Sequence, residues 1–455
     1  MDPATAVTAN VLVAVAGFAG CVVLLMLLIA RWKWHVLLAL LLPIVLFGIL
    51  PGIERNSFID AFEQGFGDTL GKIGIVIVLG SIIAEALRHT GAVEVITRSM
   101  VWLVGARRMP FALTMTGFVL GIAIFSDVAY VILNPLVHSA AHAMGVGMGT
   151  MSIGLVGALQ LTHAIVPPTP GPLAAAALVG ADIGRVIIFG SVACLGGSIA
   201  GWIWGQFVAG PRIKTKPSAE FNAQTFLDAT AARRLPSTWR SYAPIAVPVL
   251  LISAQSVVSL VLAPDRIVSV ILAYAGWPVV ALGIGLWLAF LNLGPVESRV
   301  ETVNQWVRDG LKTSAMILVV TGLGGSLSAI LKGTPAVGFV ADFFAANGLP
   351  AILLPFMIGV IGNMLTGSTT VGVITAASLV APMLGVLHLS PEAAMLSGAS
   401  GSVILKYVNS SYFWVCTSLS GLEVKEALVG YGGVTLIGGL ASFAVVWIMW
   451  AAGMI

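Results

Sequence analysis

The chain interrupts one of its own apolar segments with a dense run of prolines. From Thr162 to Pro172 the sequence reads Thr-His-Ala-Ile-Val-Pro-Pro-Thr-Pro-Gly-Pro, and apolar residues flank this run on both sides. Proline lacks a backbone N–H and its ring clashes with the preceding turn, so four prolines in six residues cannot continue a helix. Unwound backbone at membrane depth persists only where it is buried in protein or lines a cavity. The run therefore predicts a helix that is broken inside a membrane protein.

A second interruption lies at the corresponding place in the second half of the chain. There Lys406-Tyr407-Val408-Asn409-Ser410-Ser411 places polar groups inside another apolar stretch. Paired broken helices in matching positions are the best sequence indication of a transporter's binding site. The two breaks together predict a transport protein whose site lies between its two halves.

Composition supports a membrane protein independently of the breaks. Of the 455 residues, 58% are hydrophobic and only 9% are charged, and the mean hydropathy is +1.03. Soluble domains do not have this balance, so we predict an all-α polytopic membrane protein. The first apolar segment, residues 11–30, follows an acidic start without a small-residue cleavage site, which favours a retained helix over a signal peptide.

Several functional classes lack their motifs. No basic stripe with interleaved aromatic residues indicates nucleic-acid binding. The glycine-rich stretch 67–73 has the wrong spacing for a phosphate-binding loop, and Ile73 stands where Ser or Thr is needed, so no ATP motor is predicted. The three cysteines are scattered through apolar segments, and His138 and His142 share a helix face without an acidic or cysteine partner at ligand spacing. We therefore expect no metal and no cofactor.

Apolar runs of about 20 residues are the unit that crosses a bilayer. We expect spans at 11–30, 34–51, 73–88, 184–208, 243–263, 267–291, 313–331 and 425–452. Shorter apolar pieces come in pairs, which predicts re-entrant hairpins and half-helices. These pairs are 111–124 with 128–143, 151–166 with 172–180, 350–365 with 369–386, and 391–405 with 412–420.

One long polar segment, residues 211–241, separates two halves, 1–210 and 242–455. In each half we expect a scaffold and a set of transport elements. The predicted scaffold is 11–51 and 243–291, and the predicted transport elements are 111–182 and 350–422. Short matches recur between the halves at an offset of 241 to 244 residues, for example Leu178-Val179-Gly180-Ala181-Asp182-Ile183 with Leu419-Ser420-Gly421-Leu422-Glu423-Val424. The steady offset predicts an internal duplication.

The basic residues indicate the orientation of the chain. With the N-terminus outside and the hairpins at 111–143 and 350–386 entering from opposite faces, sixteen of the 22 Lys and Arg residues lie inside, five outside and Lys406 within the membrane. The positive-inside rule favours this arrangement, in which the central loop is cytoplasmic. The two halves then have opposite orientations, so the sequence predicts an inverted repeat, each half with one re-entrant helical hairpin and one broken transmembrane helix.

The two predicted hairpin tips and the two breaks converge in this arrangement. Their hydroxyls, amides and open backbone groups suit a hydroxylated carboxylate, whose charge is favoured at helix N-termini. The candidate substrate-binding residues are Ser126, Asp127, Thr162, His163, Asn363, Thr366, Gly367, Ser368, Thr369, Lys406, Asn409 and Ser410. The candidate residues of the first helix break are Pro167, Pro168, Pro170 and Gly171.

Three ionisable residues in this set each have an alternative role. Asp127 is an acid inside a membrane segment, where an ionisable residue marks function unless it makes a structural hydrogen bond. His163 could carry protons near neutral pH or act as a structural histidine at the break. Asp127 and His163 are therefore the candidate proton-coupling residues. Lys406 could bind the substrate carboxylate or form a structural ion pair with Asp127.

Several segments resemble the gluconate permease family of bacterial proton symporters. In the first half they are Gly117-Phe118-Val119-Leu120-Gly121, Phe125-Ser126-Asp127 with the residues up to Leu136, the proline run, and Ala181-Asp182-Ile183-Gly184. In the second half they are Gly367-Ser368-Thr369-Thr370-Val371-Gly372, Gly401-Ser402-Val403-Ile404 and Val408-Asn409. The resemblance covers nearly the whole chain except the central loop.

The resemblance implies uptake of a small organic acid across the bacterial cytoplasmic, or inner, membrane. Gluconate, related sugar acids, short hydroxy acids and D-serine are among the substrates of that family, and its members are commonly homodimers thought to use an elevator motion. Gluconate members usually carry Glu in place of Asp127, Arg in place of Asn363, Asp in place of Ser410 and His in place of Thr169. We therefore hypothesise that Lys406 supplies the missing cation.

The leading hypothesis is a proton symporter for a small carboxylate, either a sugar acid such as gluconate or a short hydroxy acid. A Na⁺-coupled carboxylate carrier of the same fold is an alternative, because the oxygen-rich hairpin tips could ligate a hard cation. A D-serine or amino-acid transporter is another. An intramembrane enzyme would need a nucleophile–base pair or a metal cluster, for which His163 with Asp127 is the only candidate pair. A passive channel fits inverted broken helices less well than a carrier does.

Overall fold

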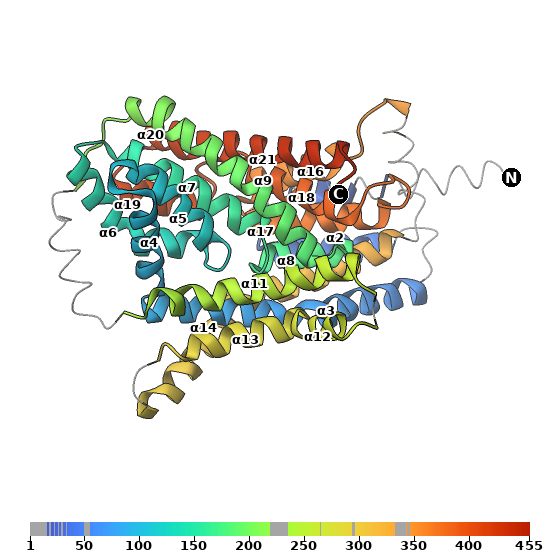
Figure 1. The fold of residues 1–455 in the computed structure, drawn as a ribbon. Coiled ribbons are helices and arrows are strands. Elements are labelled where there is room, and N and C mark those ends of the chain that lie inside the picture. The colour runs from blue at the N-terminus through green and yellow to red at the C-terminus, as the bar shows by residue number, and fades with distance from the viewer. Residues whose placement is uncertain are drawn as a thin grey trace, which may run out of the picture.

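Every secondary-structure element that the structure describes is a helix, which confirms the predicted all-helical class (Figure 1). The computed structural model describes residues 34–49, 55–218, 235–263, 265–293, 296–332 and 346–455, with scattered positions between 16 and 32 and Phe343. Among these residues, six helices are long and apolar enough to cross a membrane, and a seventh span results if one bent pair counts as a single crossing. Most of the predicted first span and residues 219–234 of the predicted linker lie outside the described residues.

One layer of the molecule is built on two long helices, α3 (Arg55–Thr90) and α14 (Val296–Lys332), which pack along their length. The predicted spans 73–88 and 313–331 are the apolar ends of these helices. Helices α3 and α14 form a layer with α11 (Thr238–Val261), α12 (Ile267–Ala275) and α13 (Pro278–Phe290) (Figure 1). The shorter α2 (Val36–Gly48) packs on α14.

The predicted span 267–291 consists of two helices, α12 and α13. It bends by 66° between α12 and α13. Trp277 precedes Pro278 and has an extended backbone, with φ −59° and ψ 125°. Steric clash with the proline ring disfavours the helical region for the preceding residue, so the chain leaves α12 and starts α13 with proline at its first position.

The second layer contains the predicted short apolar pieces, and each is a separate helix. In the first half these are α5 (Met109–Gly121), α6 (Ser126–Met144), α7 (Met148–Ile165) and α8 (Pro170–Val179), followed by α9 (Ile183–Ile203). In the second half they are α16 (Leu353–Thr366), α17 (Thr369–Val380), α18 (Pro391–Val403) and α19 (Ser411–Ser420), followed by α21 (Gly433–Ala451).

Short elements complete the fold. They are α4 (Ala92–Val104), α20 (Val424–Ala427), the π-helical turns η2 (Trp204–Ala209) and η5 (Leu428–Gly432), and the 3₁₀ turns η1 (Ala106–Arg108), η3 (Gly210–Arg212) and η4 (Ala381–Met383). The two π-helical turns contact each other, and the Trp204 indole N–H donates to the carbonyl of Val429 at 3.1 Å.

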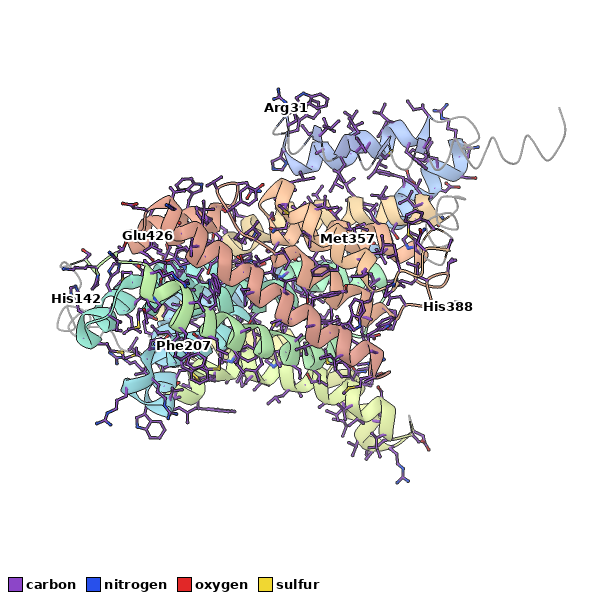
Figure 2. The ribbon with its side chains drawn as sticks, turned by 90° about the horizontal axis from the view of Figure 1, so that it is seen from above. Arg31, His142, Phe207, Met357, His388 and Glu426 are labelled. Carbon is purple, nitrogen blue, oxygen red and sulfur yellow. The ribbon has the colours of Figure 1, made fainter. Side chains whose placement is uncertain are left out.

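The two helical pairs that carry the predicted tips point in opposite directions. Figure 2 shows His142, near the end of α6, and His388, which follows α17, at opposite ends of the molecule. The chain turns between α5 and α6 at one tip and between α16 and α17 at the other. The two turns therefore reach the middle of the molecule from opposite sides.

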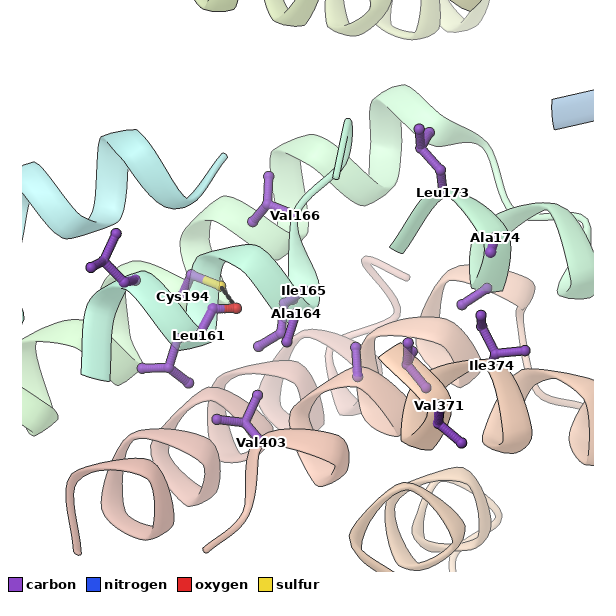
Figure 3. Packing of buried hydrophobic residues seen from close by; sticks show 14 of the residues in the cluster. Leu161, Ala164, Ile165, Val166, Leu173, Ala174, Cys194, Val371, Ile374 and Val403 are labelled. Carbon is purple, nitrogen blue, oxygen red and sulfur yellow. Dashed lines mark hydrogen bonds between the residues drawn. The ribbon is translucent and has the colours of Figure 1, made fainter. Parts of the chain in front are cut away.

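The core of the second layer surrounds α7, which is buried on nearly every side. Figure 3 shows Leu161, Ile165 and Val403 packed together, with Leu173 and Ile374 further along the same cluster. Small residues let neighbouring helices approach α7 closely, since a Cβ on Gly157 would come within 2.4 Å of a Val434 methyl carbon. A helix without a solvent or lipid face can place a polar side chain deep in the protein, away from both media.

The close approach of α3 and α14 generates the first prediction. A Cβ on Gly325 would lie 2.1 Å from Thr69 Oγ1 and 2.3 Å from the Gly65 carbonyl oxygen. Gly325→Ala should therefore force the helices apart and lower the free energy of unfolding by roughly 1–3 kcal/mol. The matched control is Gly71→Ala on α3, where nothing lies within 4 Å of the added carbon. Thermal unfolding in detergent should show a lower melting temperature for the first variant alone, and equal melting temperatures would contradict the packing argument.

Candidate functional site

The first break is a four-residue unwound stretch, Val166–Thr169, between α7 and α8. Pro167 and Pro168 lie in it. Pro170 and Gly171, predicted as break residues, instead form the first turn of α8, because proline is tolerated where the N–H has no intrahelical acceptor. The Thr169 hydroxyl lies 2.9 Å from the carbonyl oxygens of both His163 and Val166, so it can donate to groups that the end of α7 leaves free.

The second break, residues 404–410, is longer and holds a strained residue. Leu405 has φ +55°, a left-handed conformation that is uncommon for a bulky side chain. The next backbone N–H, that of Lys406, donates to Thr435 Oγ1 at 2.9 Å. Thr435 in turn donates to the carbonyl of Tyr431 at 3.0 Å. Thr435 on α21 therefore fixes the backbone from which the Lys406 side chain extends.

Lys406 reaches from the second break to the second tip. Its Nζ donates to Asn363 Oδ1 at 2.7 Å and to the Gly367 carbonyl at 2.6 Å, and the residue is only 3% exposed. None of the ion pairs within 4.0 Å among the described residues includes Lys406, so the alternative ion pair with Asp127 is not formed. An ammonium group has three N–H donors, so one donor and the charge remain available to a ligand.

The second tip is held against the second break by further hydrogen bonds. Asn363 Nδ2 donates to the Ile404 carbonyl at 2.8 Å, and Asn409 Nδ2 donates to the Met364 carbonyl at 2.7 Å. Gly367 ends α16 with φ +73°, and a Cβ there would lie 2.3 Å from the Asn409 carbonyl oxygen. Only glycine satisfies both the left-handed backbone and this close contact.

Two other residues of the second tip shape the start of α17. Thr366 Oγ1 accepts from the Ser368 N–H at 3.0 Å. The Ser368 side chain caps α17 by accepting from the Val371 N–H at 3.3 Å. Both predicted residues therefore organise the turn through local hydrogen bonds.

Gln160 on α7 connects the two tips, and the sequence reasoning missed it. Ser126 Oγ donates to Gln160 Oε1 at 3.3 Å, and Gln160 Nε2 donates to Thr369 Oγ1 at 3.1 Å. The residue is 2% exposed. Gln160 lies six residues before Val166, where the first break begins. A search limited to the two breaks therefore does not find it. The available signal was an amide inside the short apolar segment 151–166.

The first tip carries Asp127, and His163 lies near the end of α7, just before the first break. Asp127 lies in the first turn of α6, where its Oδ1 accepts from the Val128 N–H at 2.9 Å. The His163 ring is 5.1 Å from the ring of Phe125, the residue before the first turn of α6. Within the described part of the chain, His163 Nδ1 and Thr162 Oγ1 are buried without a hydrogen-bond partner. Buried polar atoms without a partner call for an explanation, such as a ligand or ordered water.

Four half-helices begin at this site: α6, α8, α17 and α19. Gly171 at the start of α8 lies against Thr370, because a Cβ on it would come within 3.2 Å of Thr370 Oγ1. The N-cap residues of α6, α8 and α19 make no side-chain cap. In α6, however, Asp127 accepts from the Val128 N–H, and the prolines at 170 and 172 leave Gly171 as the one N–H donor among the first three residues of α8. The open N–H groups of α19 and the positive end of its dipole favour an anion.

Two histidines considered as metal ligands have other partners. His138 Nδ1 accepts from the Ser218 N–H at 3.0 Å, which leaves Nε2 to donate to the Leu419 carbonyl at 2.9 Å. His142 Nε2 lies 2.8 Å from the Ser218 carbonyl oxygen. Both side chains therefore bind backbone and attach Ser218, in the first part of the predicted linker, to α6.

An all-helical membrane protein with two unwound spans around a shared set of buried polar groups has the architecture of a transporter. A family model described as GntP family permease matches residues 10–452. The chain belongs to the GntP permease family. Its homologues are permeases and not enzymes.

Individual relatives agree with this family, and a solved structure shares the fold. The D-serine transporter DsdX of Escherichia coli K12 is 30% identical, with 93% of this chain and 95% of that protein covered. The high-affinity gluconate transporter of the same organism is 27% identical, with 90% and 92% covered. The crystal structure of the Alcanivorax borkumensis YdaH transporter, described as having an unusual topology, shares the fold with a TM-score of 0.60 at 15% identity, covering 87% of this chain and 88% of the other.

Thr435 generates the second prediction. Thr435→Val keeps the shape of the side chain but removes the oxygen that accepts from Lys406 N–H, so the second break should lose its anchor. We expect affinity for a bound carboxylate to fall by about tenfold, the effect of one lost hydrogen bond of about 1.4 kcal/mol. Calorimetry on purified protein would measure it, with Thr435→Ser as the control that retains the hydroxyl. Equal losses for both variants would contradict a role for this hydrogen bond.

Proposed function

We propose that this permease is a secondary active transporter that takes up a small hydroxylated carboxylate across the bacterial cytoplasmic membrane by proton symport. A sugar acid such as gluconate, or a short hydroxy acid, is the substrate class we favour. The observation that carries the proposal is Lys406, a buried cation that pairs with no carboxylate among the described residues and reaches from the second break to the second tip.

The electrostatics of the site support an anionic substrate. A buried charge without a countercharge is costly, so a ligand carboxylate that pairs with Lys406 would recover part of that cost. The uncapped N-terminus of α19, which directly follows the second break, adds partial positive charge. Hydroxyl and amide groups of Ser126, Gln160 and Thr369 surround the site and suit substrate hydroxyls.

The names of the relatives fit the same chemistry. One is a gluconate transporter and another is a D-serine transporter. Gluconate and D-serine both carry a carboxylate next to a carbon with a hydroxyl or amino group. Lys406 would bind the shared carboxylate, and D-serine or another amino acid is therefore the second substrate candidate.

Proton coupling would use Asp127 and His163. Asp127 stands at the first tip, and the buried His163 ring lies 5.1 Å from the ring of its neighbour at that tip, Phe125. A proton taken up by this pair would compensate a carboxylate bound at Lys406. The alternative is Na⁺ coupling through the oxygen atoms of the two tips, and it predicts uptake that follows a sodium gradient instead.

We also propose the larger arrangement expected from the sequence: an inverted repeat with the N-terminus outside, working as a homodimer by an elevator motion. The separation of the helices into two layers supports it, since α3, α11, α13 and α14 pack together while the tips and breaks all lie in the other layer (Figure 1). Labelling of single cysteines introduced at the two ends of the molecule would test the orientation.

The third prediction tests the proposed substrate class. Purified protein should bind D-gluconate, D-glycerate or D-serine, and binding should raise the melting temperature by mass action. Lys406→Met should weaken carboxylate binding by about a hundredfold, roughly 3 kcal/mol, because the counterion for the carboxylate is lost. Lys425→Met, which removes an exposed lysine on α20, is the control and should bind like the wild type. Unchanged affinity of Lys406→Met in calorimetry would reduce Lys406 to a structural partner.

The fourth prediction tests proton coupling. Asp127→Asn should abolish concentrative uptake driven by a pH gradient in proteoliposomes, because the amide cannot exchange a proton, while exchange of substrate between the two sides continues. Asp68→Asn, which changes an exposed carboxylate on α3, should leave both activities intact. Concentrative uptake by Asp127→Asn at the wild-type level in Na⁺-free buffer would rule out the proton role of this residue.

A further inference from the structure

Gln160 is a polar residue of the site that hydrogen-bonds to both tips. It lies on α7, which is buried on nearly every side, and its amide is the link between the start of α6 and the start of α17. A buried amide in a core helix is costly unless its hydrogen bonds are satisfied. Ser126 and Thr369 satisfy one acceptor site on Oε1 and one donor on Nε2.

The amide retains further hydrogen-bonding capacity. A glutamine side chain has two N–H donors and two acceptor sites on its oxygen, so one of each remains beyond the two bonds to the tips. Both remaining sites belong to one planar group. Such a group can bind a substrate hydroxyl as donor or acceptor, and a substrate ammonium as acceptor.

The position of the amide relative to Lys406 suggests which substrate group it meets. Thr369, which binds Gln160, is two residues from Gly367, whose carbonyl accepts from Lys406 Nζ at 2.6 Å. Lys406 Nζ and the Gln160 amide therefore both hydrogen-bond to the short turn between α16 and α17, at Gly367 and Thr369. In a 2-hydroxy or 2-amino acid, the polar group on carbon 2 is adjacent to the carboxylate.

We propose that Gln160 is a specificity-determining residue that recognises the hydroxyl or amino group on the carbon next to the substrate carboxylate. This inference rests on the proposed function, because it assumes that Lys406 binds the carboxylate. A site that hydrogen-bonds a substrate hydroxyl rejects the analogue that lacks it, since the buried polar groups are then left unpaired. Gln160 would therefore make the transporter discriminate against acids with a plain CH₂ at carbon 2.

The experiment compares substrate pairs that differ only at carbon 2. D-glycerate and D-serine are each compared with 3-hydroxypropanoate, and D-gluconate is compared with 2-deoxy-D-gluconate. Binding to the purified full-length protein is measured by calorimetry. Wild-type protein should favour the substituted acid of each bound pair by about tenfold or more. Gln160→Leu should bring this ratio close to one, because the hydrogen bond to the group on carbon 2 is lost. The affinity for the deoxy acid, which lacks that group, should stay within about threefold of wild type.

A second variant keeps the bridge between the tips. In Gln160→Glu, the hydroxyls of Ser126 and Thr369 can both donate to the carboxylate, so the tips stay connected. The added negative charge favours an ammonium over a hydroxyl at carbon 2, so the affinity ratio of D-serine to D-glycerate should rise by about tenfold. A purely structural glutamine would not change this ratio. Gln255→Leu on α11 is the control and should leave every ratio unchanged.

The outcomes separate this inference from the proposed function. If wild-type protein binds the parent acids but Gln160→Leu weakens both members of each pair equally, Gln160 is structural and the inference is wrong, although the proposed function stands. An unchanged D-serine to D-glycerate ratio in Gln160→Glu also overturns the inference. If wild-type protein binds none of these acids, the proposed function fails and the inference fails with it.

Discussion

The architecture depends on satisfying backbone polar groups where the chain unwinds inside the membrane. No water is available there, so each carbonyl and N–H released by a broken helix needs a partner within the protein. Thr169 provides one at the first break by approaching two carbonyls, and Thr435 provides one at the second break by binding the Lys406 N–H. Amide side chains do the same for the second tip, where Asn363 and Asn409 donate to carbonyl groups. Each break is therefore stable only in contact with other parts of the chain.

This requirement brings the binding groups together. The partners that stabilise the breaks come from distant segments, so the breaks and tips must meet, and their meeting concentrates polar groups in an apolar protein. The cation of Lys406 and the amide of Gln160 are both almost fully buried at this place. Low local dielectric strengthens their interactions with a ligand and makes them costly without one. Under the proposed function, substrate affinity and the stability of the broken helices rest on the same contacts.

Much of the site could be predicted from the sequence because proline and glycine have strong local effects. The run at 167–172 locates the first break to within a few residues, and the short apolar pieces correspond to helices α5 to α8 and α16 to α19. Local rules also explain the errors. Pro170 starts a helix because its missing N–H costs nothing there, and Pro278 bends a segment that hydropathy alone reads as one span. Gln160 was missed because its importance comes from Ser126 and Thr369, which are distant in sequence.

By itself the sequence determined the all-helical membrane class, the positions of both breaks and the resemblance to a permease family, because these depend on composition, helix-breaking residues and local motifs. Only the tertiary structure decided which partners each polar group has. Lys406 could have paired with Asp127 on sequence grounds, yet it binds Asn363 and the Gly367 carbonyl. Hydrogen bonds between segments depend on distances of a few ångströms that spacing along the chain does not encode. The packing of four half-helices around α7 sets those distances, and with them the charge that the site presents to a substrate.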